Sequence, residues 1–462
     1  MKNFLSIILL SLLLTSCKKG FLSLNPESEA NAENYYKTAK GFNTALIGAY
    51  ARFTDYPTMY FEMSSYRSDE LSLGAPTAGT QDRYNIDKFA DDPSNQILLN
   101  VWGNLYNGIS RCNEIIARLP DASLGDAERR QVEAEARFIR AYHYYHLVKF
   151  WGNVPLITQP VSPSESLKAG SVPSGQILST LADDLRFARE NLPERFASQA
   201  DLGRATSGAA TVLLAKVLME QKNYAEVQRL LKPLLTSRYK LLNDIAEVFK
   251  VTNKNNEEVI FSIRYNKEVP GAGHGLWLGT TSAKSSLVPP KLLAAYGAND
   301  RRRDLLLYAR SGSSNNFVPN KFMDVISATT QNAENDWILL RFSEVLLMYA
   351  EAVNELGYTP SGDAFNCLNI VHRRSAIADP NFTSASLPNQ AAFRDAVQLE
   401  YKLELAYEGQ RWLILTRTGK AASAIRQEEN INLPTFRLLF PIPQTEVEKI
   451  GNPSIMPQNP GY

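Results

Sequence analysis

The sequence predicts a mainly α-helical protein in which helical hairpins form a scaffold that carries long irregular loops and a few short strands. Apolar residues recur at three- and four-residue steps over several long segments, which is the spacing of one helix face. Stretches rich in Pro, Gly, Ser and Asn separate these segments and indicate turns and loops. The chain of 462 residues is 44% hydrophobic and 21% charged, a composition typical of a folded protein.

The first long helices are expected at about 95–119 and 126–150. Leu98, Val101 and Leu105 begin an apolar face in the former, and an Asp-containing turn precedes the latter. Gly152 and Pro155 end the second helix. Another pair follows at 174–192 and from 207 onward, and after a turn at 221–224 the helix resumes over 225–235. These segments predict antiparallel helical neighbours.

The stretch 209–230 places small Ala side chains at packing positions and has a short turn before Tyr224-Ala225. This pattern is typical of a tetratricopeptide-like hairpin. Similar pairs are expected at 337–356 with 361–377, and at 390–408 with 410–418. The spacing is irregular, so the sequence predicts a scaffold of such hairpins rather than a uniform solenoid.

Between the helical segments, three regions differ in character. Residues 258–265 alternate and are rich in β-formers, which predicts a strand. The stretch 53–93 is predicted to be a long irregular loop, and loops of that length are usually functional. A second, glycine-rich loop surrounds His274 and Trp277. The proline-rich segment 440–462 is expected to be an extended, packed tail.

Charge and cysteine content exclude several classes of function. Lys and Arg number 49 against 48 Asp and Glu, so the formal net charge of +1 supplies no field for nucleic acid. The three cysteines cannot make a disulfide framework, and no Cys/His cluster has zinc spacing. We therefore expect no nucleic-acid partner, no metal site and no cofactor. A calcium site is the open alternative, since the acidic loop residues Asp82, Asp87, Asp91 and Asp92 could contribute ligands, although they lack the EF-hand pattern. Cys112 and Cys367 are expected to be buried free thiols, with a disulfide between them as the alternative.

The N-terminus has the pattern of a signal peptide over residues 1–16. Lys2 precedes an apolar run from Phe4 to Leu14, which is too short to span a bilayer as a helix. The run ends in Leu14-Thr15-Ser16-Cys17, which resembles the lipobox of bacterial lipoproteins. This resemblance implies cleavage before Cys17, acylation of Cys17 and a lipidated tether over 17–33. The alternative is a signal peptide without lipidation.

Several side chains that suggest chemistry are better explained by packing. His143 and His146 share a helix face among tyrosines, with no carboxylate close by, which favours a role in helix packing. Glu404 and Glu408 are expected to form hydrogen bonds or ion pairs with neighbouring helices, as are Glu351 and Glu355. The basic run 301–303 is expected to be a solvated helix start. No nucleophile elbow or phosphate-cradling loop occurs, so we predict no catalytic residues and no enzyme activity.

Motifs along the whole chain resemble the SusD/RagB family of Bacteroidetes outer-membrane nutrient-binding lipoproteins. These motifs are Trp102–Asn113, Ala134–Tyr142 continuing into Phe150–Leu156, Leu340–Ala352, Glu404–Trp412, Leu439–Gln444 and Gln458–Tyr462. The resemblance implies an N-terminal SusD-like helical region over 34–255 and a C-terminal SusD/RagB-like region over 256–462. It also implies a lipid-anchored protein of the outer membrane that faces the cell surface.

Members of this family bind oligosaccharides or peptides and pass them to a TonB-dependent channel. The resemblance therefore implies an oligosaccharide ligand and a SusC-like TonB-dependent transporter as partner. Candidate ligand-binding residues are Asp69, Asp82, Arg83, Tyr84 and Trp277, since aromatic rings stack on sugars while polar groups bind hydroxyls. A peptide-binding member, a helical-repeat envelope adaptor and a surface hydrolase are the alternatives.

Overall fold

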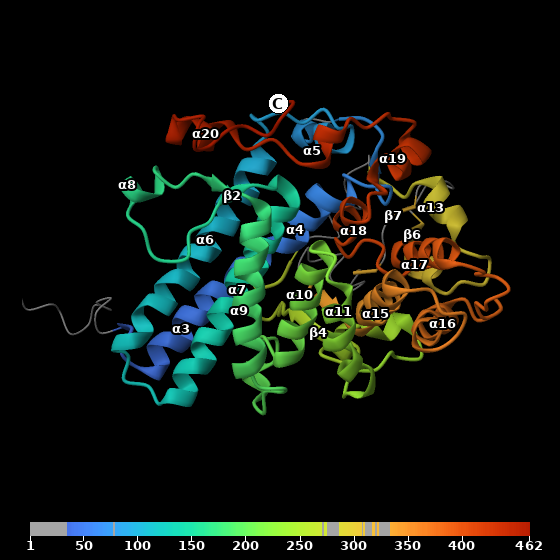
Figure 1. The fold of residues 1–462 in the computed structure, drawn as a ribbon, viewed down its shortest axis with the longest axis horizontal. Helices are drawn as coiled ribbons and strands as arrows, with labels where there is room; N and C mark the ends of the chain where they lie inside the picture. Colours follow the sequence, from blue (N-terminus) through green and yellow to red (C-terminus); the bar gives the residue numbers. More distant parts are fainter. Residues whose placement is uncertain are drawn as a thin grey trace, which may run out of the picture.

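The computed structural model describes residues 35–76, 79–269, 272–274, 286–306, 308–309, 317–318, 321–322 and 333–462. Long helices dominate the N-terminal half, and shorter helices with small sheets form the C-terminal half (Figure 1). The predicted mainly α-helical class is confirmed. The predicted signal peptide, the tether, Cys17 and Trp277 lie outside the described residues.

The first half of the chain contains the longest helices, together with short 3-10 turns (η) and one π-helical turn, η3. Its elements are α3 (Ala39–Tyr50), η2 (Ala51–Asp55), α4 (Tyr56–Tyr60), η3 (Phe61–Ser65), β1 (Ser72–Leu73), α5 (Gln81–Asp87), α6 (Gln96–Arg118), η4 (Leu119–Asp121), α7 (Asp126–Trp151), β2 (Val154–Pro155), α8 (Pro163–Ser166), β3 (Ser171–Val172), α9 (Ser174–Asn191), η5 (Gln199–Asp201), α10 (Ser207–Glu220), α11 (Tyr224–Leu231), η6 (Lys232–Thr236), η7 (Ile245–Val248) and η8 (Val251–Asn253).

The second half combines strands with helices of at most 15 residues among those described. Its elements are β4 (Val259–Ile263), β5 (Ser286–Leu287), α13 (Pro290–Ala295), α14 (Arg302–Leu306), β6 (Tyr308–Ala309), β7 (Phe317–Val318), β8 (Trp337–Arg341), α15 (Phe342–Leu356), α16 (Asp363–Ser375), α17 (Gln390–Glu404), α18 (Arg411–Arg417), α19 (Ala421–Glu429), η10 (Thr435–Leu438) and α20 (Gln444–Ile450).

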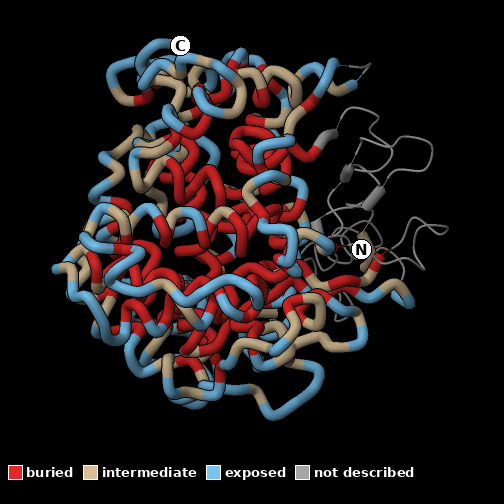
Figure 2. Tube along the Cα trace, turned by 90° about the vertical axis from the view of Figure 1, so that its right-hand side faces the viewer, coloured by how far each residue is buried: buried red, intermediate tan, exposed pale blue. Residues whose placement is uncertain are grey.

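Helix α7 lies at the centre of the N-terminal half, because nearly every residue from Ala134 to Trp151 is buried. It packs against α6 and α9, and α9 packs in turn against α10. Pairs of neighbouring helices also form from α10 with α11 and from α15 with α16. These pairs match the hairpins predicted at 209–230 and at 337–377, whereas α17, predicted to pair with 410–418, packs against α15 and α16. Figure 2 shows the resulting buried interior beneath an outer layer of exposed turns and helix ends.

The predicted strand at 258–265 is present as β4, but its partner was missed. Residues 337–341, expected to begin a helix, form β8 and pair antiparallel with β4, with Trp337 opposite Ile263 and Leu340 opposite Phe261. The run Trp-Ile-Leu-Leu is apolar throughout and buried in full, so it has no period that separates strand from helix. Only the presence of β4 beside it decides the conformation.

The prediction of an irregular loop over 53–93 is wrong for most of that stretch. It contains α4, the π-helical η3 and α5, and its first part is buried. Tyr56, Met59, Tyr60 and Met63 recur at three- and four-residue steps and enter the core. Pro57 occupies the first turn of α4, where the missing N–H has no helical partner to lose.

Two smaller corrections concern charged and proline-rich segments. The C-terminal segment contains helix α20, because its prolines flank the helix and Pro443 supplies the cap position. Arg302 in the basic run is buried rather than solvated, since it pairs with Asp300 at 2.7 Å and with Glu400 at 2.7 Å. Cys112 and Cys367 are buried free thiols, as predicted. Burial raises the pKa of each thiol to about 12.

Candidate binding site

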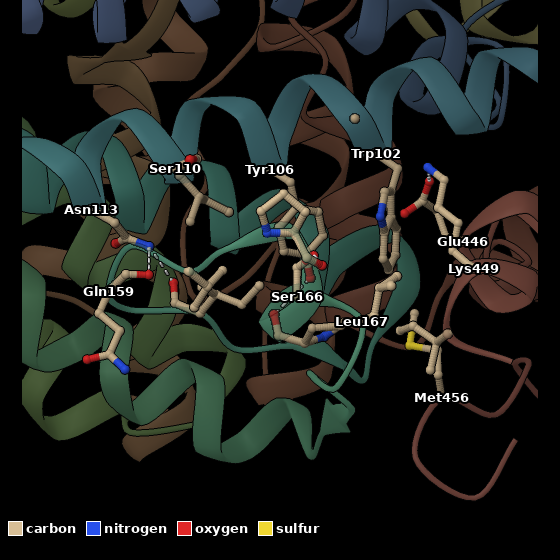
Figure 3. A pocket seen from close by; sticks show the side chains of 17 residues that line it. Trp102, Tyr106, Ser110, Asn113, Gln159, Ser166, Leu167, Glu446, Lys449 and Met456 are labelled. Carbon is tan, nitrogen blue, oxygen red and sulfur yellow. Dashed lines mark hydrogen bonds and ion pairs between the residues drawn. The ribbon is translucent and has the colours of Figure 1, made fainter. Parts of the chain in front are cut away.

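A cavity of about 500 Å³ opens on one flank of α6 (Figure 3). Helix α6 supplies one wall, the β2–β3 connection with α8 supplies the second, and α20 with Met456 supplies the third. The volume falls within the range of about 300–1,000 Å³ that small-molecule sites occupy. We name this the α6–α8 cavity.

The sequence of α6 explains why this flank carries mixed side chains. Asn95 caps the helix by accepting hydrogen bonds from the backbone N–H groups of Ile97 and Leu98. The apolar stripe that begins at Leu98 faces the core. A neighbouring stripe places Trp102, Tyr106, Ser110 and Asn113 along the cavity at three- and four-residue steps (Figure 3).

The β2–β3 connection is held against α6 by side chains of the cavity itself. The Tyr106 hydroxyl donates to the carbonyl of Pro155 at 2.8 Å, and the Asn113 amide donates to the carbonyl of Ile157 at 2.9 Å. The strands pair Val154 with Val172 at the base of the loop. These bonds set the position of the second wall relative to the first.

The third wall comes from the end of the chain. The backbone N–H of Ser171 donates to the carbonyl of Ile455 at 2.8 Å, which ties the C-terminal segment to β3. On α20, Lys449 and Glu446 pair with each other at 2.6 Å. These two are the charged residues among those that line the cavity, so the lining has no unpaired charge.

The chemistry of the α6–α8 cavity is therefore that of a neutral, partly aromatic surface. The rings of Trp102 and Tyr106 lie 5.1 Å apart between centroids, and Trp102 forms the deep part of the wall with only 4% of its surface exposed. Ser110 and Gln159 add hydroxyl and amide groups that are exposed. Leu167, 46% exposed, forms an apolar rim. Such a surface suits C–H faces of a neutral ligand together with a few hydrogen bonds.

The residues predicted to bind ligand lie elsewhere. Asp69 is buried and pairs with Arg411 at 2.6 Å and with Lys402 at 2.8 Å, and these cations hold its carboxyl pKa well below the usual range despite burial. Asp82 accepts from the backbone N–H of Gln96 at 3.0 Å, at the start of α6. Neither residue lines the α6–α8 cavity.

Arg83 and Tyr84 lie on α5, in the same part of the structure as Asp82. The Arg83 Nε donates to both carboxylate oxygens of Glu62, at 2.9 and 2.8 Å. Tyr84 is partly buried against the core. The structure thus brings Asp82, Arg83 and Tyr84 onto one short helix, while Trp277 falls outside the described residues. Their role in binding stays a prediction.

Trp102 and Tyr106 were recognised as a motif but not as lining a cavity. The available signal was the second stripe on α6, in which two aromatic residues are followed by two hydrogen-bonding residues beside the apolar stripe. No such signal exists for Leu167 or Met456, since tertiary contacts alone bring them to the site.

The histidines of α7 serve packing, as predicted. Tyr56 and His143 share a hydrogen bond of 2.9 Å, as do Tyr60 and His146, and both imidazoles are fully buried. Burial lowers the pKa of each histidine to about 3, so both are neutral at physiological pH. The predicted ion pairs of Glu351 and Glu355 are also present, with Arg417 and Arg394 respectively.

Among the described residues no group of three or more His, Cys, Asp or Glu side chains is arranged to hold a metal ion. Within the same residues, none of the helices has the length and apolar character needed to cross a membrane.

The fold and the cavity define a class: a non-uniform scaffold of helical hairpins with a concave site on its flank. Known proteins of this class match the chain. The family described as "SusD family" matches residues 308–462, and the family described as "Starch-binding associating with outer membrane" matches residues 21–219. The chain belongs to the SusD/RagB family, as the sequence motifs predicted.

Relatives match over nearly the whole chain or over part of it. The SusD-like protein P25 of Formosa agariphila is 26% identical, with 97% of this chain and 96% of the relative covered. The starch-binding protein SusD of Bacteroides thetaiotaomicron is 26% identical over 44% of this chain and 38% of its own. Proteins of the SusD family are non-catalytic binding proteins, so the prediction that this chain is not an enzyme is confirmed.

Solved structures share the fold. The surface glycan-binding protein A from Bacteroides fluxus superposes with a TM-score of 0.80 at 25% identity, covering 92% of this chain and all of that one. The protein of the same name from Bacteroides thetaiotaomicron, solved in complex with laminarihexaose, has a TM-score of 0.75 at 24% identity and covers 92% of this chain and 100% of its own. The latter comparison bears on the fold alone.

Proposed function

We propose that this protein is a cell-surface lipoprotein that binds a neutral oligosaccharide and delivers it, without catalysis, to a TonB-dependent outer-membrane transporter. Membership of the SusD/RagB family supports a surface glycan-binding role at the outer membrane. The observation that carries the ligand class is the α6–α8 cavity, in which Trp102 and Tyr106 lie beside hydroxyl and amide groups with no unpaired charge.

The binding test uses Gly103, which lies on the cavity wall. A Cβ built at Gly103 meets no atom within 4 Å, so Gly103→Leu extends into the cavity without disturbing α6. Leu also raises helix propensity relative to Gly, by about 1 kcal/mol or less. The matched control is Gly175→Leu in α9, where the added Cβ also meets nothing and no cavity residue is near in sequence.

Calorimetry of the mature chain with laminarihexaose and maltohexaose should detect binding of at least one of them. We expect Gly103→Leu to weaken that binding tenfold or more, because the side chain occupies the space of the ligand, while Gly175→Leu leaves it unchanged. Equal binding by both variants would place the ligand elsewhere. In that case Tyr84→Ala and Arg83→Ala test the residues predicted from the sequence.

A peptide ligand is the second candidate, and the apolar rim favours it. Val161 and Leu167 are 38% and 46% exposed, and such side chains suit apolar residues of a peptide as well as sugar C–H groups. Hexapeptides of neutral sequence in the same calorimeter distinguish the two ligands. Binding of peptides without any binding of oligosaccharides would replace the glycan in the proposal.

The anchor and the partner are tested in cells. Cys17→Ala removes the acylation site, so we expect the protein to leave the membrane fraction, and surface proteolysis of the unaltered protein tests its orientation. Affinity purification of the unaltered protein from solubilised outer membranes should recover a TonB-dependent transporter. Recovery of the protein alone under several mild detergents would contradict the partnership.

A further inference from the structure

A second, smaller cavity of about 210 Å³ lies on a different flank of α6. Its walls are α6 on one side and the turns η2, α4 and η3 on the other. From α6 it takes Asn100, Asn104 and Leu105, whereas the α6–α8 cavity takes Trp102, Tyr106 and others. We name it the α4–α6 cavity. Its volume is below the range of drug-sized sites, so it suits a ligand of about one ring.

Two opposite charges line the α4–α6 cavity without a partner. Arg52 and Asp55 lie three residues apart on the 3-10 turn η2, a spacing that places side chains on one side. Within the described part of the chain, neither side chain forms an ion pair or hydrogen bond with the other or with any third residue. The Nε–H of Arg52 is buried and has no acceptor.

This absence of partners is local rather than general. Glu62 lines the same cavity, and its carboxylate is fully engaged by the guanidinium of Arg83 at 2.8 and 2.9 Å. Arg111, farther along α6, donates to Asn107 at 2.9 Å and to the carbonyl of Gly48 at 3.1 Å. Among the described residues, the charged groups at the cavity that have no partner are therefore one guanidinium, that of Arg52, and one carboxylate, that of Asp55.

Two side-chain amides and an apolar surface complete the α4–α6 cavity. Asn100 is exposed and Asn104 is half-buried, and no side-chain hydrogen bond of either is found among the described residues. Met59 and Leu105 are 3% and 2% exposed and supply apolar surface. Guanidinium groups bind carboxylates in bidentate fashion, while carboxylate and amide groups bind sugar hydroxyls.

We infer that the α4–α6 cavity binds one carboxylated sugar ring, a hexuronate, as a second site distinct from the neutral α6–α8 cavity. Arg52 binds the ligand carboxylate, and Asp55, Asn100 and Asn104 bind its hydroxyls. Met59 and Leu105 contact the C–H face of the ring. This site goes beyond the proposed function, because it gives the protein a recognition element for acidic saccharide units.

The test is calorimetry of the mature, full-length chain with methyl glucuronide and methyl galacturonide, and with methyl glucoside as the neutral control. We expect saturable binding of at least one uronide, at least tenfold weaker binding of the glucoside, and loss of affinity at high salt, because a charged pair is screened. Arg52→Met keeps the aliphatic stem but removes the guanidinium, and should weaken uronide binding tenfold or more. Asp55→Asn should weaken it several-fold.

The control variant is Arg111→Met, which removes an arginine of α6 that does not line the cavity and should leave binding unchanged. Near-ultraviolet circular dichroism and thermal melting establish that each variant is folded. Gly103→Leu should retain uronide binding, so the proposals for the two cavities are tested independently. No uronide binding, binding unaffected by Arg52→Met, or binding of free amino acids in place of uronides would overturn the proposal.

Discussion

Two regions of the molecule bury polar side chains in different ways: the contact between α4 and α7, and the surroundings of β8. Between α4 and α7 the buried polar groups are neutral. The Tyr60 hydroxyl lies 3.1 Å from the hydroxyl of Tyr142 and 2.9 Å from Nε2 of His146. In the C-terminal half, Arg341 on β8 contacts Glu258 at 2.9 Å, Glu404 at 2.5 Å and Glu408 at 2.7 Å. All of these side chains are buried.

The difference has an energetic consequence. A neutral hydrogen bond that is lost leaves a dipole without a partner, which costs about 1–3 kcal/mol. A buried ion that is lost leaves an uncompensated charge, which costs about 3–5 kcal/mol. We therefore expect the β4–β8 region to tolerate substitution of its polar groups far less well than the α4–α7 region.

The largest effect is expected for Glu404→Gln. Glu404 pairs with Arg341 and Arg374 and lies 3.6 Å from Arg302, so the variant leaves these buried cations with less negative charge. The free energy of unfolding, measured in urea, should fall by about 3–5 kcal/mol. Glu190→Gln, at an exposed position in α9, is the control and should change it by less than about 0.5 kcal/mol. Similar losses in both variants would contradict the role of the network.

A second effect concerns the dependence of stability on pH. Glu70 follows η3, and burial raises its pKa to about 8 from a usual value near 4.5. The folded state therefore keeps a proton that the unfolded state loses between about pH 4.5 and 8, so stability falls as pH rises through this window. Glu404 and Asp69 have pKa values below the usual range, and their contribution is lost only as pH falls below about 4.5.

Glu70→Gln removes the titrating carboxyl group. It should therefore remove the part of the stability loss at rising pH that Glu70 causes. From pH 5 to pH 8, the free energy of unfolding of Glu70→Gln should rise by roughly 2–4 kcal/mol relative to that of the unaltered protein. Urea unfolding at both pH values measures it. A difference that is the same at pH 5 and pH 8 would show that Glu70 does not titrate in this window.

The smallest effect is expected for Tyr60→Phe. The ring remains in place, and only the hydroxyl between Tyr142 and His146 is removed. Urea unfolding should show a loss of about 1–2 kcal/mol, because the Tyr142 hydroxyl and Nε2 of His146 each lose a neutral hydrogen-bond partner. Phe53→Leu, an apolar change in the same cluster, separates packing from hydrogen bonding. A loss as large as that of Glu404→Gln would show that the α4–α7 region tolerates loss of a polar group no better than the β4–β8 region.

The long helices were predictable because their amphipathic period is local. Helix α6 was expected at 95–119 and runs from Gln96 to Arg118, and α7 was expected at 126–150 and runs from Asp126 to Trp151. The turns over 51–65 were missed because 3-10, α and π turns follow one another there, so the helical period extends over only 56–63. Strand β8 was missed because its apolar run fits strand and helix equally.

The candidate site was only partly predictable. The stripe that carries Trp102 and Tyr106 is visible in the sequence of α6, but the cavity exists because the β2–β3 connection and α20 lie over it. Asp69 illustrates the reverse case. It lies within the loop expected at 53–93 and suggested ligand binding, whereas the structure pairs it with Arg411, which lies 342 residues away in the chain.

The sequence by itself determined the helical class, the two long central helices and the family, because each depends on local period or on motifs in order. Only the tertiary structure decided which charged side chains pair with one another. Arg83 and Glu62 neutralise each other, while Arg52 and Asp55 remain without partners among the described residues. Charge pairing depends on contacts between distant segments, and such contacts leave no periodic signal in the chain.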